Sequence, residues 1–470
     1  MSKNILLSTD SYKASHYLQY PEGTEYVSSY IESRGGKWDE TVVFGLQMFL
    51  KEYLTKPFTQ EDLDEADAFW NAHGEPFNRE GWQYILNEYD GYMPVRIQAV
   101  PEGTVLPTCN VMVQVQNTDP KVPWLTSFLE TSLLRALWYP TTVATNSFAA
   151  KRVIYDALNE TAEDADVEIM FKMHDFGARG VSSGESAGIG GCAHLVNFMG
   201  TDTVEGVLYA RKYYGEEMAG FSIPASEHST ITTWGGPEGE IDAFRNMIKQ
   251  FGKPDSMLAV VSDSYNIYNA CENLWGGKLL QEVKDSGALV IVRPDSGDPT
   301  KVPIECVKIL MNKVGYETND NGYKVLPQYF RVIQGDGITV DTIKQILDNM
   351  QAEGLSASNI AFGQGGGLLQ QIDRDTLKFA MKASAIKVNG KWHDVYKQPI
   401  DQPDKVSKKG RLALTNSCGI GACGWDTVRE NEVYGSENML QDVFLNGKLL
   451  VNDSFANIRE RAAQGLKDLL

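Results

Sequence analysis

Residues 288–297 have the sequence Ala-Leu-Val-Ile-Val-Arg-Pro-Asp-Ser-Gly, in which an apolar, β-branched run is followed at once by a polar turn. A short run of this kind is typical of a strand that is buried on both faces of a sheet. The sequence therefore predicts a buried parallel strand that carries charged side chains at its carboxyl end.

The same pattern returns between residues 168 and 369. Apolar runs precede polar, mostly glycine-bearing turns at four further places: 167–171 before 174–177, 257–261 before 262–264, 330–333 before 334–337, and 360–362 before 363–367. Strands that alternate with helices predict an α/β fold with a parallel sheet covered on both faces. Closing this sheet into a β/α barrel would bring every polar turn to one rim. An open doubly wound sheet is the alternative.

The clearest helix between these strands is predicted over residues 340–353. Apolar residues recur there at helical spacing up to Met350, and Gly354 follows as a helix-ending residue. A second amphipathic helix is predicted over residues 454–470.

The two ends of the chain have a different pattern. Alternating strands are predicted at 26–31, 95–100 and 111–115, and a hairpin at 443–445 and 449–451 around Asn446-Gly447. We therefore expect an α+β portion over 1–150, a β/α barrel catalytic domain over 151–385, and a C-terminal portion over 386–470 that packs back on the first.

The composition excludes several classes of function. Lys and Arg number 43 against 62 Asp and Glu, giving a net charge of −19, so no basic surface for nucleic acid or anionic lipid is expected. No run approaches the roughly 20 apolar residues of a membrane helix. The six cysteines and six histidines show no zinc-ligand spacing. These features predict a globular, cytoplasmic protein without nucleic-acid or membrane partners.

Two glycine-rich turns are candidate anion sites. Gly335-Asp336-Gly337 and residues 365–367 each follow a strand and precede a helix, where free backbone N–H groups and the helix dipole favour a phosphate. Neither turn has the spacing of a Rossmann or P-loop motif. Tight structural turns are the alternative, but two such turns on neighbouring strands favour one shared phosphate.

Charged and aromatic side chains after the other strands are candidates for binding and catalysis. Asp263 and Asp295 are placed to hold ribose hydroxyls directly or through Mg²⁺, with Arg293 as a counter-charge for an anion. Phe176 and Arg179 could stack and orient a flat heterocycle. The alternatives are a structural ion pair and a buried structural phenylalanine.

Taken together, eight short motifs resemble the nicotinamide phosphoribosyltransferase family, of the type II phosphoribosyltransferase fold. They occur in the same order over essentially the whole chain, at residues 9–13, 174–183, 200–203, 224–230, 262–265, 293–297, 334–337 and 365–370. The resemblance implies an irregular β/α barrel with an added α+β sandwich domain. It also implies transfer of phosphoribosyl from 5-phosphoribosyl 1-pyrophosphate to nicotinamide in NAD salvage, with Mg²⁺, with ATP as a coupling substrate, and in a homodimer with shared active sites.

The resemblance also implies roles for individual residues. Phe176 stacks on one face of the pyridine ring, and Tyr12 of the partner subunit covers the other face. Asp202 accepts from the carboxamide NH₂ group, and Arg179 lies near the ring and the pyrophosphate. The remaining roles are Asp263, Arg293 and Asp295 for ribose and metal; Gly335, Asp336, Gly365 and Gly366 for the 5′-phosphate; Arg34, Arg374 and residues 405–411 for pyrophosphate or nucleotide phosphates; and His228 for phosphorylation during ATP coupling.

The sequence departs from the vertebrate members at Ala178, where they carry an aromatic residue, and in a shorter segment after Arg34. A nicotinate phosphoribosyltransferase is the nearest alternative, and Asp202 argues against it because a carboxylate repels a carboxylate. A non-catalytic nucleotide-binding protein is less consistent with the set of charged residues. A lyase or aldolase would need a Schiff-base lysine at a strand end, where none is found.

Overall fold

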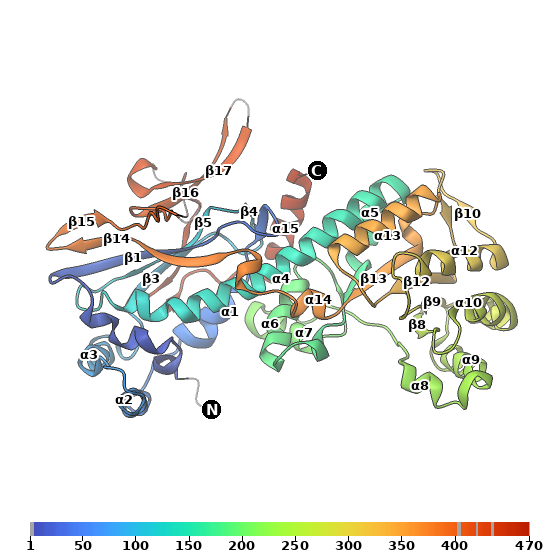
Figure 1. Ribbon diagram of the computed structural model, residues 1–470, viewed down its shortest axis with the longest axis horizontal. Helices are drawn as coiled ribbons and strands as arrows, with labels where there is room; N and C mark the ends of the chain where they lie inside the picture. Colours follow the sequence, from blue (N-terminus) through green and yellow to red (C-terminus); the bar gives the residue numbers. More distant parts are fainter. Residues whose placement is uncertain (1–3, 402–405, 420–421, 434–436, 470) are drawn as a thin grey trace. The chain divides into compact units, whose positions relative to one another are not determined.

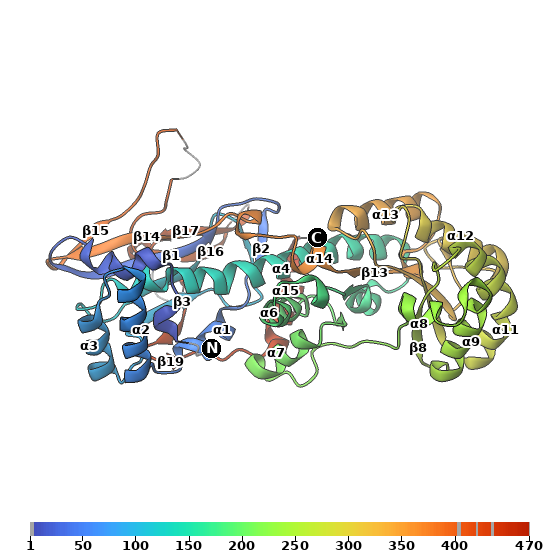
Figure 2. The same cartoon turned by 60° about the horizontal axis from the view of Figure 1, so that its bottom comes forward.

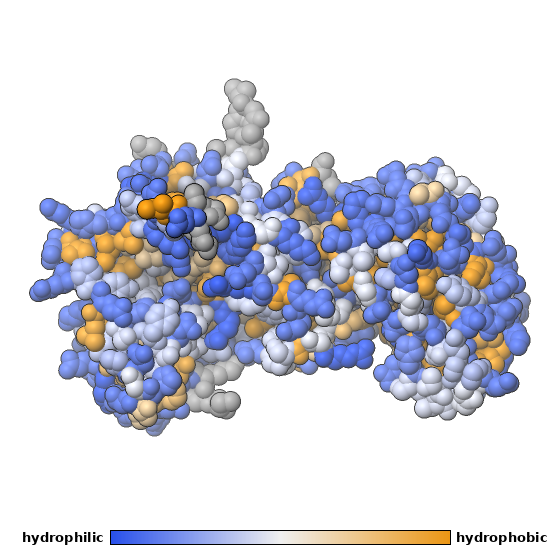
Figure 3. Space-filling view, in the orientation of Figure 1, coloured by the Kyte–Doolittle hydropathy of each residue, from blue (hydrophilic) through white to orange (hydrophobic). Residues whose placement is uncertain are grey.

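The computed structural model describes residues 4–401, 406–419, 422–433 and 437–469. The chain forms two compact units (Figures 1 and 2). Unit 1 comprises Met1–Thr145, Lys212–Glu216 and Ile372–Leu470, and unit 2 comprises Asn146–Arg211 and Glu217–Gln371. Among the described helices, none has the length and apolar character needed to cross a membrane. The face drawn in Figure 3 is mainly hydrophilic, with smaller apolar areas between the polar ones.

Unit 2 is built on six parallel strands. In sheet order they are β7 (Gly200–Thr201), β6 (Met173–Asp175), β13 (Ile360–Gln364), β12 (Phe330–Gln334), β9 (Leu289–Arg293) and β8 (Met257–Val261). The predicted strands after residue 250 are confirmed, and β8 and β9 are neighbours, as are β12 and β13.

A short extended segment, residues 221–225, joins the two edges of this sheet. Phe221 forms a parallel bridge with Gly200 at one edge, and Ala225 forms one with Ala259 at the other. The backbone N–H of Phe221 donates to Met199, and that of Ala259 donates to Pro224, at 2.7 and 2.9 Å. The strands therefore follow one another around a closed ring in chain order, which confirms the irregular β/α barrel and excludes the open sheet.

Helices cover the outside of the barrel. The longer ones are α6 (Gly184–His194), α7 (Val204–Tyr214), α9 (Glu240–Phe251), α12 (Val302–Val314) and α13 (Val340–Ala352). Shorter helices are α8 (His228–Thr232), α10 (Ile267–Asn269), α11 (Leu280–Ser286), α14 (Gly366–Leu369) and a π-helix at Ala270–Lys278. Unit 2 also contains a small hairpin of the strands β10 (Glu317–Thr318) and β11 (Lys324–Val325). The helix predicted at 340–353 is confirmed: Thr339 caps it and Gly354 follows with φ +70°.

The expected strand at 167–171 is wrong. These residues form α5 (Ala165–Glu168) and a 3₁₀ turn (Ile169–Phe171), and the strand begins only at Met173. The Asp164 carboxylate caps the helix by accepting from the N–H of Val167, and acidic residues in the first turn favour the helix.

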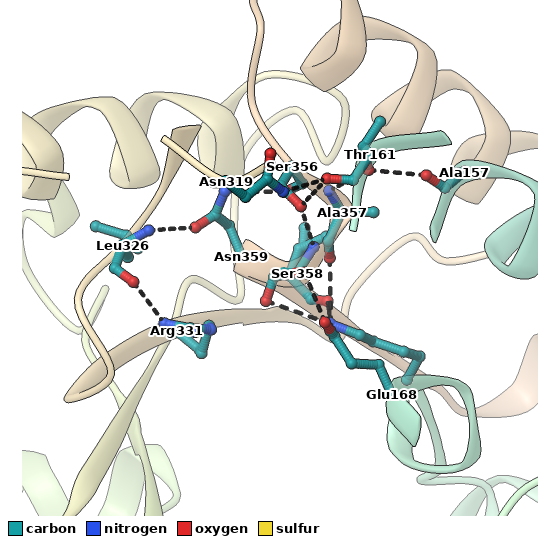
Figure 4. Close-up of polar contacts among 12 residues, drawn as sticks. Ala157, Thr161, Glu168, Asn319, Leu326, Arg331, Ser356, Ala357, Ser358 and Asn359 are labelled. Atoms are coloured by element: carbon teal, nitrogen blue, oxygen red, sulfur yellow. Dashed lines mark hydrogen bonds and ion pairs between the residues drawn. The ribbon is translucent and has the colours of Figure 1, made fainter. Parts of the chain in front are cut away.

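A buried polar network holds this helical turn against the start of β13 (Figure 4). Ser358 donates to Glu168 at 2.7 Å, and the Lys172 ammonium pairs with Glu168 at 2.8 Å. The same ammonium donates to the backbone carbonyls of Ala357, Ser358 and Ile360. The Lys172 ammonium is thus held by protein acceptors and has a structural role.

Unit 1 is a seven-stranded antiparallel sheet to which both ends of the chain contribute. Its order is β15 (Lys391–Asp394), β14 (Phe379–Val388), β1 (Thr24–Ser33), β5 (Val111–Asn117), β3 (Val95–Ala99), β18 (Gln441–Leu445) and β19 (Lys448–Leu449). β1 pairs with β14 and β3 pairs with β18, so the C-terminal portion packs back on the N-terminal one, as expected. The boundary expected at residue 385 falls inside β14, and that at residue 150 falls inside α4 (Leu125–Thr161).

The core of unit 1 lies between the sheet and helices. Trp70 of α2 (Gln60–His73), Trp82 of α3 (Arg79–Tyr89) and Phe128 of α4 pack in one buried cluster with Ile97 and Val113 of the sheet. Smaller elements are α1 (Leu46–Phe49), the pair β2 (Glu40–Val42) and β4 (Val105–Pro107), the pair β16 (Leu412–Gly419) and β17 (Ala422–Arg429), and the C-terminal helix α15 (Phe455–Leu469). The predicted hairpin turns at Asn446 and Gly447, whose φ angles are +47° and +83°.

Candidate active site

The interior of the barrel in unit 2 contains a cavity of about 790 Å³. The barrel interior stays open because small or slender side chains from four strands and from the closing segment 221–225 line it: Ala259, Ile291, Ile333, Ala361 and Ala225. On β9, Val290 and Val292 are buried, whereas Ile291 and Arg293 line the cavity. A cavity of this size accommodates a small molecule.

Phe176 follows β6 and lines this cavity. Its backbone N–H donates to Gln364 of the neighbouring strand at 2.9 Å. A Cβ atom at Gly363 would overlap the Phe176 ring, and one at Gly335 would lie 3.5 Å from it. The structure thus brings Phe176 and Gly335 together. Sequence reasoning missed Gly363, although a glycine inside a strand pattern is a signal of close approach.

Asp175, at the end of β6, connects the Phe176 loop to Asp202. Its side chain accepts from the N–H of Gly177 at 2.7 Å, and its backbone carbonyl accepts from the N–H of Asp202 at 2.9 Å. The side chain is fully buried, and hydrogen bonds from Gly177 and Thr203 only partly offset the cost of burying its charge. Burial raises the pKa of Asp175 to about 6, and the charge of Asp202 adds to this effect.

Asp202 itself lines the cavity, together with His174, Ala178 and Arg179. Burial lowers the pKa of His174, although the nearby charge of Asp202 opposes the shift. His174 is therefore a neutral imidazole at neutral pH. Ala178 occupies the wall of the same cavity, so its small side chain widens the cavity there.

A polar cluster of one histidine and two carboxylates follows the strands β8 and β9. His228 Nε2 lies 3.0 Å from Asp263 Oδ1, and His228 Nδ1 lies 3.9 Å from Asp295 Oδ2. The second oxygen of Asp263 accepts from the N–H of Asp295 at 3.0 Å and from Ser296 at 2.5 Å. Arg293 contacts Asp295 at 3.3 Å. The structure thus brings together His228, predicted to be phosphorylated, and the three residues predicted for ribose and metal, Asp263, Arg293 and Asp295.

Two acidic groups that influence each other, Asp263 and Glu240, differ in ionisation. Burial disfavours the charge of Asp263, but its bonds from Ser296, His228 and the Asp295 N–H outweigh burial and lower its pKa. Glu240, almost fully buried at the start of α9, has its pKa raised to about 7 by burial and by the charge of Asp263. Sequence reasoning missed Glu240, which no motif marks.

The two glycine-rich turns lie on the neighbouring strands β12 and β13. The Gln334 side chain donates to the backbone carbonyl of Asp336 at 2.9 Å, which braces the first turn. Gly365 is the residue before α14 and Gly366 is its first residue, so their N–H groups have no partner inside that helix. Among the described residues, no three His, Cys, Asp or Glu side chains are grouped as metal ligands.

The remaining predicted residues belong to unit 1. Tyr12 is 56% exposed in the 3₁₀ helix Ser11–Leu18, and its ring lies 5.3 Å from the Lys13 ammonium. Arg34 is partly buried and pairs with Glu32 at 2.9 Å. Arg374 lies in a neighbouring turn, because the N–H of Lys37 donates to Thr376 at 3.0 Å.

Further cations gather around Arg34. Lys408 pairs with Glu32 at 2.6 Å. Burial lowers the pKa of Lys382, and the positive charges of Arg34 and Lys397 add to the shift. Lys382 was not predicted. In the predicted basic stretch 405–411, Lys405 lies outside the described residues.

Comparison with known proteins agrees with this geometry. Residues 171–448, which include the strands β6 to β13 and their polar turns, match the nicotinate phosphoribosyltransferase (NAPRTase) family. The chain belongs to the nicotinate phosphoribosyltransferase family. Residues 4–97 also match the N-terminal domain of nicotinamide phosphoribosyltransferase. Membership makes the protein a phosphoribosyltransferase, an enzyme of the pentosyltransferase class.

Relatives in this family match nearly the full chain. A nicotinamide phosphoribosyltransferase of Xanthomonas campestris is 50% identical over 461 residues, covering 98% of each chain. One of Acinetobacter baylyi is 32% identical, covering 99% of this chain and 98% of its own. The crystal structure of human nicotinic acid phosphoribosyltransferase has the same fold, with a TM-score of 0.64 at 16% identity over 98% of this chain and 94% of that one. A nicotinate-nucleotide pyrophosphorylase of Pyrococcus furiosus also has a TM-score of 0.64 at 16% identity, over 99% and 97%.

Proposed function

We propose that this enzyme transfers a phosphoribosyl group from 5-phosphoribosyl 1-pyrophosphate to nicotinamide, forming nicotinamide mononucleotide and pyrophosphate. The observation that carries the proposal is Asp202 in the wall of the cavity that Phe176 also lines. A carboxylate accepts hydrogen bonds from a carboxamide NH₂ group and repels the carboxylate of nicotinate. The relatives named nicotinamide phosphoribosyltransferase support the same choice.

The chemistry needs positioning and charge more than a protein nucleophile. The pyridine nitrogen is neutral and carries no proton to remove, so holding the ring against Phe176 with its nitrogen toward the sugar supplies much of the catalysis. The glycine turns after β12 and β13 offer N–H groups to the 5′-phosphate. Arg179 and Arg293, on the cavity wall, neutralise charge on the departing pyrophosphate.

The acidic residues fit a bound Mg²⁺ in part. Both oxygens of Asp263 are engaged by protein donors, whereas the Asp295 side chain is 26% exposed and, in the part of the chain that the structure describes, contacts Arg293 at 3.3 Å and His228 at 3.9 Å. Mg²⁺ is usually held by one or two carboxylates together with substrate phosphates, so Asp295 is the residue that would hold it. When bound, the ion would neutralise pyrophosphate charge.

His228 is proposed to accept a phosphoryl group when ATP hydrolysis is coupled to the reaction. If the His228 Nε2–H donates a hydrogen bond to Asp263, the free lone pair of the imidazole is on Nδ1. The His228 side chain is 48% exposed. Nδ1 is 3.9 Å from Asp295, too far for a hydrogen bond, so it is free to attack a phosphoryl group.

The cations of unit 1 are proposed to bind pyrophosphate or nucleotide phosphates in an active site completed by two subunits. The support is the partly buried Arg34 and the positive charges of Arg34 and Lys397 that act on Lys382. Tyr12 of the partner subunit is proposed to cover the pyridine ring opposite Phe176, since its ring is largely exposed.

One assay tests the base. Purified enzyme is given 5-phosphoribosyl 1-pyrophosphate with nicotinamide, nicotinate or quinolinate, and mononucleotide and pyrophosphate are measured. We expect nicotinamide to be preferred at least about tenfold in kcat/KM. Nicotinate is the second candidate because Arg179 offers a cation on the same wall, and equal or better use of nicotinate would overturn the proposal.

A further inference from the structure

Ser222 lines the same cavity as Asp202 and is bonded to it. The Ser222 hydroxyl donates to Asp202 Oδ1 at 2.5 Å. The other acceptor within reach, the carbonyl of Ile223, is 3.5 Å away, so the hydroxyl donates its hydrogen bond to Asp202. The hydroxyl and the carboxylate therefore form one paired group on the cavity wall.

The barrel closure fixes where Ser222 stands. Ser222 follows Phe221, whose carbonyl accepts from the N–H of Thr201 at 3.0 Å, and Asp202 is the residue after Thr201. Asp202 is itself anchored by its N–H bond to Asp175. Both members of the pair are thus held by backbone bonds immediately beside them, so their separation does not depend on a flexible loop.

The direction of the Ser222 hydrogen determines what the pair can bind. A free hydroxyl can donate or accept, and it could donate to the carboxylate of a nicotinate. While the Ser222 hydroxyl donates to Asp202, its oxygen can only accept hydrogen bonds from a ligand. The second carboxylate oxygen of Asp202 can also accept. The pair therefore presents two acceptors and no donor to the cavity.

We propose that Ser222 and Asp202 together form a two-acceptor clamp that recognises both N–H groups of a primary carboxamide, with Ser222 as a direct specificity residue. This inference rests on the proposed function, because it deepens the choice of nicotinamide over nicotinate. It also explains how the site excludes a carboxylate although the cation Arg179 lies on the same wall. The carboxylate of nicotinate has two oxygen acceptors and no N–H donor. Against the two acceptors of the clamp it would form no hydrogen bond and would be repelled.

The test compares nicotinamide with 3-acetylpyridine, which replaces the NH₂ group by a methyl group and keeps the ring, the carbonyl and the neutral charge. Binding of both bases is measured by calorimetry, and kcat and KM are measured with 5-phosphoribosyl 1-pyrophosphate. In Ser222→Ala we expect Kd and KM for nicotinamide to rise about tenfold with kcat within about twofold, since a ground-state hydrogen bond is lost. The constants for 3-acetylpyridine should change less than about twofold.

Two variants keep the test sharp. Ser222→Thr retains the hydroxyl and should restore the preference for nicotinamide over 3-acetylpyridine. Ser256→Ala removes a hydroxyl from a turn before β8, where Ser256 donates to backbone carbonyls, and should leave both bases unaffected.

The outcomes separate the inference from the function on which it rests. If Ser222→Ala weakens both bases equally, or neither, the clamp is wrong while mononucleotide synthesis from nicotinamide still stands. If the unmutated enzyme neither binds nicotinamide nor converts it, the proposed function fails first.

Discussion

Asp175 is a buried carboxyl group that serves two loops. Its side chain accepts from the N–H of Gly177 and so holds the turn after Phe176. Its backbone carbonyl accepts from the N–H of Asp202 and so holds the start of the Asp202 turn. Because Asp175 is fully buried and its hydrogen bonds only partly offset the burial, its charge is costly in the folded protein. The residue that organises the proposed nicotinamide site thus also weakens the fold.

Replacing Asp175 by Asn should therefore stabilise the protein near neutral pH. The pKa of Asp175 in the fold, about 6, lies above its ordinary 3.8, so the folded state binds more protons between these values and wild-type stability falls as pH rises through that window. We expect the variant to gain up to about 3 kcal/mol at about pH 7 and almost nothing at about pH 4. Urea denaturation across this range measures the difference, and a gain that is independent of pH would contradict it.

Asp202 sets the charge at the end of the cavity where the carboxamide is expected. Asp202→Asn keeps the shape but replaces one acceptor by a donor, so nicotinamide should lose about 1.5–3 kcal/mol of transition-state binding, or roughly ten- to a hundredfold in kcat/KM. Nicotinate should gain relative to nicotinamide. Steady-state kinetics with both bases measure the ratio, and an unchanged ratio would show that Asp202 does not contact the substituent.

His228 is expected to link ATP to the reaction without acting as the catalytic base. His228→Ala should retain slow, ATP-independent synthesis of the mononucleotide and lose its stimulation by ATP, because the Nδ1 acceptor is gone. Rates with and without ATP, together with acid-labile phosphate on the protein, provide the measurement. Full stimulation in the variant would show that another group carries the coupling.

At the scale of elements, close packing between neighbouring βα turns places the aromatic ring. The Phe176 ring lies against β13 at Gly363, where a side chain would overlap it. A Cβ atom at Gly180, in the first turn, would lie 3.5 Å from Gly366 in the second. Glycines at these positions therefore allow the carboxyl ends of β6 and β13 to lie close together and to contribute to one site.

Gly363→Ala should displace the ring without removing any polar group. We expect KM for the base to rise about tenfold and KM for 5-phosphoribosyl 1-pyrophosphate to change much less, since overpacking costs about 1–3 kcal/mol where it occurs. Gly184→Ala is the matched control, because no atom lies within 4 Å of its Cβ position. Equal effects of the two variants on the base would argue that Phe176 does not contact it.

The sequence predicts elements well where local signals agree with the fold. Strand β9 and helix α13 have clear apolar patterns, and both elements form where they are expected. Residues 167–171 also look like a strand, yet the cap at Asp164 makes them helical. The barrel-closing residues 221–225 have almost no pattern, because two bridges and a few backbone bonds hold them.

The candidate site was predictable at its motifs and not between them. His228, Asp263 and Asp295 stand in recognisable turns and do meet in space. Ser222 and Glu240 gain their importance only from neighbours that are distant in the chain, so no local pattern marks them. Pairing across a barrel is information that a single sequence does not carry.

At the scale of the whole molecule, we expect each active site to need two chains. Tyr12→Ala and Asp295→Ala dimers should each be nearly inactive, but mixed dimers contain one site with both defects and one with neither. After demonstrated subunit exchange, an equal mixture should regain about one quarter of wild-type activity, because half the dimers are mixed and half their sites are intact. No recovery would show that Tyr12 serves its own chain or no site.

Unit 1 takes strands from both ends of the chain, and this has a consequence for biosynthesis. While the ribosome is still translating the barrel, β1 can pair with β5 but its other edge has no partner until Phe379–Val388 emerges. Unpaired edges invite pairing with other nascent chains. The barrel, whose last strand pairs with its first, is complete once Gln364 is made. Ribosome stalling in the final hundred or so codons should therefore yield a closed barrel attached to an aggregation-prone N-terminal sheet.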